Sequence, residues 1–384
     1  MIVDLKNIPE DILNIPDSKF KIVLEENDRI FDETFETESI GFFKESFTRF
    51  TRNKASIIAF YAIMAIVVLA IIAPLFSGYS YVEQNLKLKD MPPRIPVLEK
   101  IGIADGTRLL TNRKKVNVDD PKQYPPECII EIRNPQTING IECVDVLVDY
   151  YVYKGAEDVY FWFGSDYLGR DLFTRLFKGA RISLLIALLS VVTNVVIGVI
   201  YGSIAGYYGG KVDLVMMRIV EILEGLPYLV IVMLFILLFG TGMMSIILAL
   251  TITGWIGTAR LIRTQFYRYK GREYVLAART LGVPDILLIF RHILPNTVGP
   301  LITRAMISVP GAIFSESFLA YIGLGLQPPE PSIGVLLSDG QKVLLQYPYQ
   351  TFIPALLISV LMISFNLLSN GMRDALDPTQ RGGE

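Results

Sequence analysis

Cysteine and histidine are almost absent from this sequence. Its 384 residues include two cysteines, Cys128 and Cys143, and a single histidine, His292. So few thiols and imidazoles exclude a disulfide-rich scaffold and a metal cluster built from these side chains. We therefore expect no metal site.

The sequence also lacks an excess of charge of one sign. It contains 36 basic and 38 acidic residues, which gives a formal net charge of -2. Nucleic-acid binding requires a concentrated basic face, so we expect no nucleic-acid partner.

The common catalytic signatures are missing as well. There is no Gly-x-Ser-x-Gly nucleophile turn and no Gly-x-x-x-x-Gly-Lys-Ser/Thr phosphate loop. We expect no catalytic residues, no enzymatic activity and no cofactor in this chain. If this protein pumps, the energy must come from elsewhere.

The sequence is rich in long hydrophobic segments. Hydrophobic residues make up 52% of the chain, and the mean hydropathy is +0.43, which is high for a soluble domain. About 20 helical residues cross a hydrocarbon core of about 30 Å, where lipid-exposed irregular segments are not tolerated. Six runs qualify as transmembrane helices: 55–76, 182–205, 214–239, 243–262, 297–322 and 352–368.

Basic residues in the short loops predict the orientation of these spans. They are enriched before the first span and between the fourth and fifth, and such segments stay in the cytoplasm. The basic residues at 170–181 fall on the predicted outer side, but long outer segments are largely exempt from the rule. The first 40 residues are acidic and contain no apolar core, so we expect no cleaved signal peptide. Both termini are expected to be cytoplasmic.

The expected fold is an all-α polytopic membrane protein with six transmembrane helices and a small β-containing insert between the first two. Phe43, Phe47 and Phe50 recur at helical spacing, which predicts an amphipathic helix on the inner membrane surface or an extension of the first span. The chain then divides into five regions: a cytoplasmic tail at 1–54, the first transmembrane helix at 55–76, an extracytoplasmic insert at 77–163, a core with five transmembrane helices at 164–378 and a cytoplasmic tail at 379–384.

A hairpin signal lies in the insert. Residues 128–132 and 144–152 are rich in strand formers, and they flank Asn139-Gly140, a pair that favours a two-residue turn.

The register of this hairpin decides whether the cysteines can pair. With a two-residue turn Cys143 faces Gln136, and Cys128 lies eight residues further along the strand, about 26 Å away and too far for a disulfide. A wider loop that includes Pro135 would allow the bond. The pairing of Cys128 with Cys143 stays open.

The loop between the fourth and fifth spans predicts a short helix. Ala277 and Ala278 lie in it, and Gly282 followed by Pro284 ends it. A compact helix with basic flanks between two spans fits a groove on a partner protein. From the residues alone it is either an interfacial loop helix or a coupling element.

This loop resembles the coupling motif of ABC importer permeases: Glu-Ala-Ala, three residues, Gly, nine residues, Ile-x-Leu-Pro. Leu276 stands at the Glu of the motif and His292 at its Ile, and both departures are typical of the peptide-transporter branch. The resemblance implies contact with an ATPase through Glu273, Leu276, Ala277, Ala278, Arg279, Gly282, His292, Leu294 and Pro295.

Three further stretches resemble the C-type permease of oligopeptide and dipeptide importers. With the coupling loop they span 164–378 in the family's order, whereas 77–163 has no counterpart that we can carry over. The motif before the second helix comprises Asp166, Gly169, Arg170, Asp171 and Arg181, the pore or gate candidates are Glu316, Gly323, Gly325, Gln327, Pro328 and Pro329, and the third stretch runs over 365–378.

Two residue types stand out among the gate candidates. Glu316 is an intramembrane acid near the outer end of its span, where it either acts on the gate or snorkels to the interface. The glycines and prolines of 323–329 predict a semi-rigid outer loop, which we expect Glu316 to tether.

The resemblance implies a peptide importer subunit in the bacterial cytoplasmic membrane, surrounded by lipid. The implied partners are a homologous B-type permease subunit, two ABC ATPase subunits that bind ATP and Mg, an extracytoplasmic peptide-binding protein and the peptide substrate. Similar permeases import nickel, opines or oligosaccharides, so these cargoes remain alternatives. A membrane receptor is the rival from another class, but the leading tail is too short for a signalling domain. A self-sufficient secondary carrier is a further rival, and it should transport alone.

Overall fold

A computed structural model of the chain describes residues 42–376. The acidic leading segment and the tail at 379–384 lie outside the described residues. The chain divides into two compact units between Ser46 and Phe47. Only the start of α2 (Phe42–Arg52) is described in the first unit, and all later elements belong to the second.

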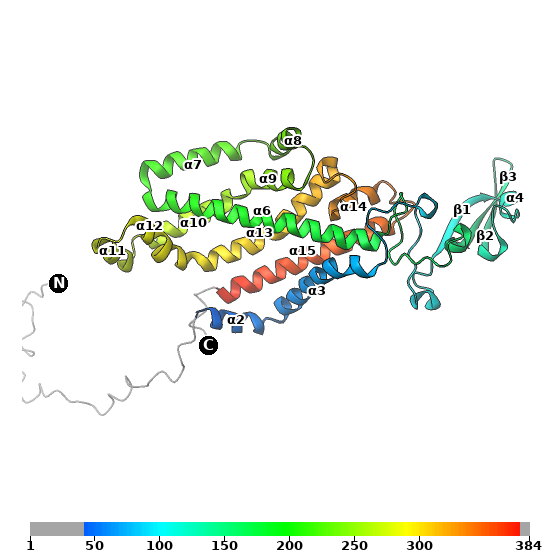
Figure 1. Cartoon of the computed structure of the whole chain (residues 1–384), viewed down its shortest axis with the longest axis horizontal. Coiled ribbons are helices and arrows are strands. Elements are labelled where there is room, and N and C mark those ends of the chain that lie inside the picture. The colour runs from blue at the N-terminus through cyan, green and yellow to red at the C-terminus, as the bar shows by residue number, and fades with distance from the viewer. Residues whose placement is uncertain (1–41, 377–384) are drawn as a thin grey trace, which may run out of the picture. The chain divides into compact units, whose positions relative to one another are not determined.

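The second unit is mostly helical. Within residues 42–376, five helical segments are long and apolar enough to cross a membrane, and a bent pair of helices provides a sixth if it counts as one span. In Figure 1, α6, α13 and α15 run alongside one another. The five segments are α3 (Lys54–Phe76), α6 (Leu172–Tyr208), α9 (Met243–Gly254) with α10 (Ile256–Tyr269), the stretch around α13 (Val298–Leu319), and α15 (Tyr349–Leu376).

The predicted third span, 214–239, is not one straight helix. α7 (Gly210–Glu224) and α8 (Tyr228–Phe239) meet at an angle of 82°. Pro227 precedes α8 in an extended conformation and has no amide hydrogen to donate, so a regular helix cannot continue through it. The prediction was wrong here because Gly225 to Pro227 form only a short break in a long apolar run.

Other helices extend beyond the apolar runs that predicted them. α6 begins at Leu172 rather than near 182, and α15 covers Tyr349–Leu376 rather than 352–368. Hydropathy marks only the part of a helix that suits hydrocarbon, whereas these helices continue into polar sequence.

α2 and α3 are separate helices. The side chain of Asn53 accepts hydrogen bonds from the amides of Ala55 and Ser56 and so caps α3. The segment before the first span is therefore not an extension of that span.

Shorter helical elements connect the long ones. They are η4 (Leu86–Leu88), η5 (Leu98–Ile101), α4 (Lys115–Val118), η6 (Pro126–Cys128), α5 (Tyr150–Lys154), α11 (Glu273–Thr280), α12 (Asp285–Leu287), η7 (Leu288–Ile293), η8 (Leu294–Thr297), η9 (Ala320–Leu324) and α14 (Ile333–Gln341).

The backbones of α6 and α10 approach closely. Gly198, Gly202 and Gly206 recur every four residues on α6, and a Cβ at Gly202 would lie 2.3 Å from the carbonyl oxygen of Ala259 on α10. Small residues at this spacing let helices pack tightly in a membrane. The end of α10, which leads to α11, is thereby held against α6.

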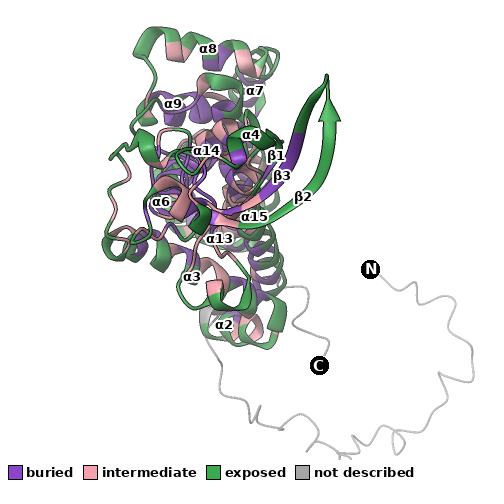
Figure 2. Cartoon of the chain, turned by 90° about the vertical axis from the view of Figure 1, so that its right-hand side faces the viewer, coloured by how far each residue is buried: buried purple, intermediate pink, exposed green. Residues whose placement is uncertain are grey.

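Three antiparallel strands lie between α3 and α6: β1 (Thr107–Lys114), β2 (Ile129–Ile138) and β3 (Ile141–Asp149), with β3 in the centre. Asn139 and Gly140 connect β2 to β3 with φ of 51° and 77°, as a two-residue hairpin turn requires. Figure 2 shows β2 exposed along most of its length and β3 partly buried.

The cysteines are not paired. Gln136 lies opposite Cys143, which is the register of a two-residue turn, and Cys128 lies beyond the other end of β2. Both thiols are buried and free. The candidate disulfide is therefore absent, and the wider loop is not formed.

The second predicted strand of the hairpin ends earlier than expected. Residues 150–152 belong to α5 because the carboxylate of Asp149 accepts hydrogen bonds from the amides of Tyr151 and Val152, an N-cap that starts a helix. Tyr151 then lies fully buried in the core of the insert, with its hydroxyl 2.8 Å from the carbonyl oxygen of Pro92.

Candidate functional site

The loop between α10 and α13 contains a compact helix, α11. It starts after Arg272 and ends at Thr280, and Gly282 then adopts a φ of +79°. This left-handed conformation favours glycine, so the helix ends here and the chain turns into Pro284. The predicted short helix is observed.

One face of α11 is buried against the helical bundle. Val275 is fully buried and Ala278 nearly so, and both pack in one apolar cluster with Phe266 of α10. The spacing of three residues places both side chains on one side of the helix. α11 is therefore packed on the bundle and does not project freely.

Polar contacts attach the same loop to the end of α6. The hydroxyl of Tyr207 donates a hydrogen bond to the carboxylate of Asp285. The guanidinium of Arg279 lies over the Tyr207 ring, 5.4 Å from its centroid, within cation–π range. Movement of α11 would thus act directly on α6.

The opposite side of the loop exposes large apolar side chains. Exposed apolar groups on a loop mark a surface that another protein can cover. They are Leu276, Leu281, Ile286, Leu287 and Phe290.

The remaining predicted coupling residues are distributed over this loop. The amide of Asn296 donates to the hydroxyl of Tyr274 at 3.1 Å, which joins η8 to α11. Glu273, Ala277 and Pro295 are exposed, and His292 and Leu294 are half-buried.

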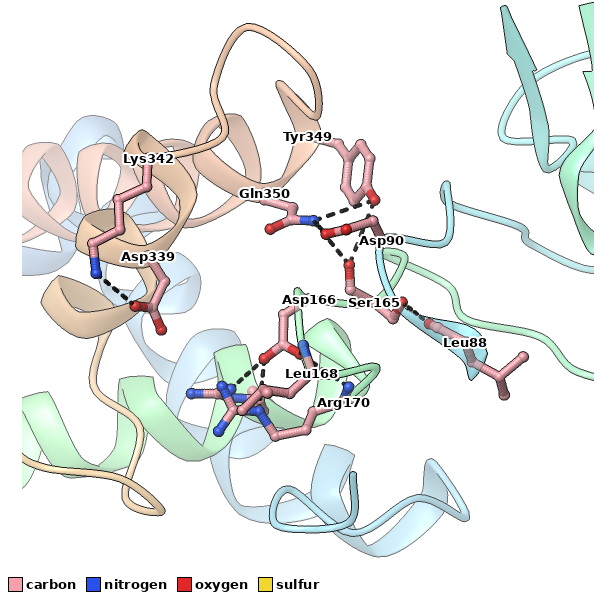
Figure 3. A network of polar contacts seen from close by, with 11 residues as sticks. Leu88, Asp90, Ser165, Asp166, Leu168, Arg170, Asp339, Lys342, Tyr349 and Gln350 are labelled. Atoms are coloured by element: carbon pink, nitrogen blue, oxygen red, sulfur yellow. Dashed lines mark hydrogen bonds and ion pairs between the residues drawn. The ribbon is translucent and has the colours of Figure 1, made fainter. Parts of the chain in front are cut away.

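The segment before α6 holds a buried charge cluster (Figure 3). Asp166 accepts a hydrogen bond from Nε of Arg170 at 2.7 Å and forms an ion pair with Arg175. The same carboxylate accepts hydrogen bonds from the amides of Leu168 and Arg170, at 2.9 and 3.0 Å. Asp166 therefore organises the turn that leads into α6.

Neighbouring motif residues complete this turn. A Cβ at Gly169 would lie 1.9 Å from the carbonyl oxygen of Asn85, and its φ is +74°, so only glycine fits. Asp171 caps α6 by accepting a hydrogen bond from the amide of Thr174 at 2.8 Å, and its burial raises the pKa of this carboxyl. Arg181 is exposed and stands apart from the cluster.

A second group of contacts joins three distant segments at the same end of α6 (Figure 3). Nε2 of Gln350 donates to Oδ1 of Asp90 at 3.0 Å and to the carbonyl oxygen of Ser165 at 3.1 Å. The hydroxyl of Tyr349 donates to the carbonyl oxygen of Met91 at 2.9 Å. No sequence motif identified these residues, and only Tyr349 and Gln350 carried a signal, as polar residues at the start of an apolar span.

Glu316 lies inside the bundle. Its side chain is fully buried on α13, and the hydroxyl of Ser183 on α6 donates to Oε2 at 2.8 Å. The same hydroxyl oxygen accepts a hydrogen bond from the amide of Ile333 at 3.2 Å. Snorkelling to the interface is therefore wrong, because Glu316 projects toward α6.

The loop after α13 has the backbone features expected of 323–329. Gly323 has a φ of +87°, and a Cβ at Gly325 would lie 2.5 Å from Cα of Ala320. Gln327, Pro328 and Pro329 are exposed. Through Ser183, Glu316 reaches the first residue of α14 and not this loop itself.

Comparison with known proteins decides the family. Residues 198–382 match the family described as binding-protein-dependent transport system inner membrane component, and residues 41–93 match the N-terminal TM domain of oligopeptide transport permease C. The chain is 36% identical over 374 residues to the dipeptide transport system permease protein DppC of Bacillus subtilis (strain 168), covering 97% of this chain and 96% of that protein. The chain belongs to the binding-protein-dependent transport permeases.

Two further similarities were found. The oligopeptide transport system permease protein OppC of Bacillus subtilis (strain 168) is 36% identical over 349 residues, covering 91% of this chain and 93% of that protein. A chain of the MetNI methionine ABC transporter in an inward facing conformation has 16% identity and a TM-score of 0.45, covering 53% of this chain and 96% of that chain.

The insert of this permease has a counterpart among its relatives. The two family matches leave residues 94–197 between them, and that interval contains the sheet and the Asp166 cluster. The match to the Bacillus subtilis dipeptide permease covers 97% of the chain, so it includes most of 77–163. The insert therefore aligns with this relative, although no family motif in it could be recognised from the sequence.

Proposed function

We propose that this permease forms one half of the translocation pore of an ABC importer for oligopeptides or dipeptides. The observation that supports this best is the 36% identity over 97% of the chain to a relative named as a dipeptide transport permease. The helical segments long enough to cross a membrane suit this role.

In this proposal α11 is the site where the ATPase acts. Its buried face is packed on α6 and α10, while Leu276 and Leu281 on its outer side are exposed. An ATPase subunit that covers these side chains would remove apolar surface from water and could push on α6 through Tyr207. ATP and Mg bind to that partner and not to this chain.

The proposed complex has a second, B-type permease, two ATPase subunits and an extracytoplasmic binding protein that delivers the peptide. Both termini and α11 lie in the cytoplasm, and the insert at 77–163 lies outside, where it meets the binding protein. The complex resides in the bacterial cytoplasmic membrane, with 164–378 as the permease core.

Residues 316–334 form the outer gate in this arrangement. Glu316 and Ser183 connect α13, α6 and the start of α14, so a shift between α6 and α13 would move α14. The loop at 323–329 would move with it.

Uptake by the reconstituted complex tests the proposal. Proteoliposomes that contain both permeases and the ATPases, with binding protein outside, should accumulate labelled dipeptides or oligopeptides only when ATP is inside. Replacing exposed Leu281 by Asp should abolish uptake. Leu345→Asp, at an even more exposed leucine on the proposed outer side, should not. ATP-dependent accumulation of nickel, opines or oligosaccharides in place of peptides would reject the substrate assignment.

A further inference from the structure

One face of α13 is not covered by any other part of the described chain. The exposed positions recur at intervals of three and four residues, so they form a single stripe along the helix. The opposite face, which includes Ile313 and Glu316, is buried. The stripe consists of Arg304, Ile307, Gly311, Phe314 and Phe318.

Arg304 is the charged member of this stripe. It lies in the second turn of α13 (Val298–Leu319), about 9 Å along the axis from the start of that helix. Within residues 42–376 its guanidinium has no hydrogen-bond or ion-pair partner. Arg304 lies in no recognised motif, but a cation within an apolar span marks a functional residue by default.

The guanidinium of Arg304 packs against the backbone of α10 at Gly257. A Cβ at Gly257 would lie 2.2 Å from Nη2 of Arg304, so the missing side chain at 257 makes room for the cation. Packing against this backbone limits the positions that the guanidinium can take.

A lipid-facing surface would have a different composition. Between residues 185 and 204 the exposed stripe of α6 is aliphatic, as hydrocarbon requires, and it includes Leu185, Leu188, Val192 and Val196. A charged side chain at membrane depth is costly in lipid, and it normally faces a bundle interior or a water-filled pathway. The charge of Arg304 therefore distinguishes the α13 stripe from a surface that only contacts lipid.

We propose that Arg304 lines the translocation pathway and binds the carboxylate of the passing peptide. The proposal rests on the proposed peptide import. A planar guanidinium forms paired hydrogen bonds with a carboxylate, and a peptide with a free carboxyl terminus always carries one. Ile307 and the two phenylalanines would contact its apolar side chains.

Two peptides that differ only at the carboxyl terminus provide the test. One is a free acid and the other its carboxyl-terminal amide, chosen so that the binding protein holds both with equal affinity. The readout is the ratio of their ATP-dependent uptake rates in proteoliposomes. Every permease variant is assayed with the same binding protein as wild type. A change in this ratio therefore originates in the membrane complex.

Arg304→Gln should lower the ratio of free-acid to amide uptake about tenfold, as expected for the loss of a charge-assisted hydrogen bond. Arg304→Lys should retain part of the preference because it keeps the charge. Arg218→Gln removes an exposed cation on α7 that pairs with Glu221 and should leave the ratio unchanged.

Two outcomes would overturn the proposal. Equal loss for both peptides, together with dissociation of the two permeases, would assign Arg304 to the permease interface. An unchanged ratio with a loss of uptake that depends on anionic lipid content would assign it to a lipid phosphate. If wild type takes up neither peptide, the proposed function itself fails, whereas failure of this inference alone leaves wild-type uptake intact.

Discussion

Nε of Arg170 lies 2.7 Å from Oδ2 of Asp166, and the two side chains are only 1% and 3% exposed. Arg175 shares the same carboxylate. Asp166→Asn keeps the shape of the side chain but leaves two buried guanidinium groups without a counter-charge. We expect a loss of about 3–5 kcal/mol in the free energy of unfolding, visible as a lower unfolding temperature of the purified complex.

Glu224→Gln is the matched control for this change. Glu224 also pairs with an arginine, Arg260, but both side chains are more than 40% exposed. Exposed pairs contribute about 0–1 kcal/mol, so the unfolding temperature should hardly move. Equal shifts for the two variants would show that the Asp166 cluster is not a stabilising element.

A second prediction concerns two buried serines on α6. Ser183 bonds both Glu316 and the amide of Ile333, whereas the hydroxyl of Ser190 is buried without a hydrogen-bond partner in the described residues. Ser183→Ala should cost about 1–3 kcal/mol in unfolding free energy because it leaves buried partners unsatisfied. Ser190→Ala should be near neutral. Thermal unfolding of both variants checks this, and a similar loss for both would show that the Ser183 contacts contribute little.

Local sequence patterns were sufficient to predict several elements. The Asn139-Gly140 pair predicted the hairpin and favoured the two-residue turn that is observed, and that turn fixes the pairing of its flanking strands; the wider loop with Pro135 had remained open. Gly282 and Pro284 predicted where α11 ends, since glycine and proline act on the backbone within one or two residues.

Contacts between distant residues were not predictable in this way. The hydrogen bond between Asp90 and Gln350 joins positions 260 residues apart, and neither residue lies in a recognisable motif. Hydropathy likewise did not reveal that Glu316 faces α6 and is buried while Arg304 lies on the exposed stripe of α13, because it averages over all sides of a helix.

Membrane topology provides a third prediction. With Cys128 and Cys143 replaced by Ser, a cysteine at Asn139 should react with an impermeant maleimide in intact cells. In the unmodified protein both native thiols are buried, and burial raises the pKa of the Cys128 thiol, so the protein without an introduced cysteine should react little. Leu281→Cys, in the exposed part of the α11 loop, should react only after permeabilisation. The reverse pattern would invert the topology.

Coupling provides the last prediction, at Gly282. Its φ is +79°, and a Cβ there would meet nothing within 4 Å in this chain. Gly282→Asp should therefore fold, at a cost of about 1–2 kcal/mol for the left-handed backbone. If the ATPase covers α11, the new carboxylate is desolvated at that interface, which costs several kcal/mol of binding free energy. Such a cost weakens ATPase docking more than about a hundredfold. We expect peptide uptake and substrate-stimulated ATP hydrolysis to be lost while the protein still inserts.

Gly155→Asp separates the effect of docking from that of backbone strain. Gly155 lies in the insert with a φ of +63°, and a Cβ there would also meet nothing within 4 Å. An Asp at this position therefore introduces the same kind of backbone strain at a site distant in sequence from α11. Stimulated ATP hydrolysis by the reconstituted complex should stay near the wild-type rate in Gly155→Asp and fall to the basal rate in Gly282→Asp. Because the two changes strain the backbone alike, only contact of another subunit with Gly282 can produce this difference. Near-normal stimulation in Gly282→Asp would mean that ATP hydrolysis reaches the pore by a route other than α11.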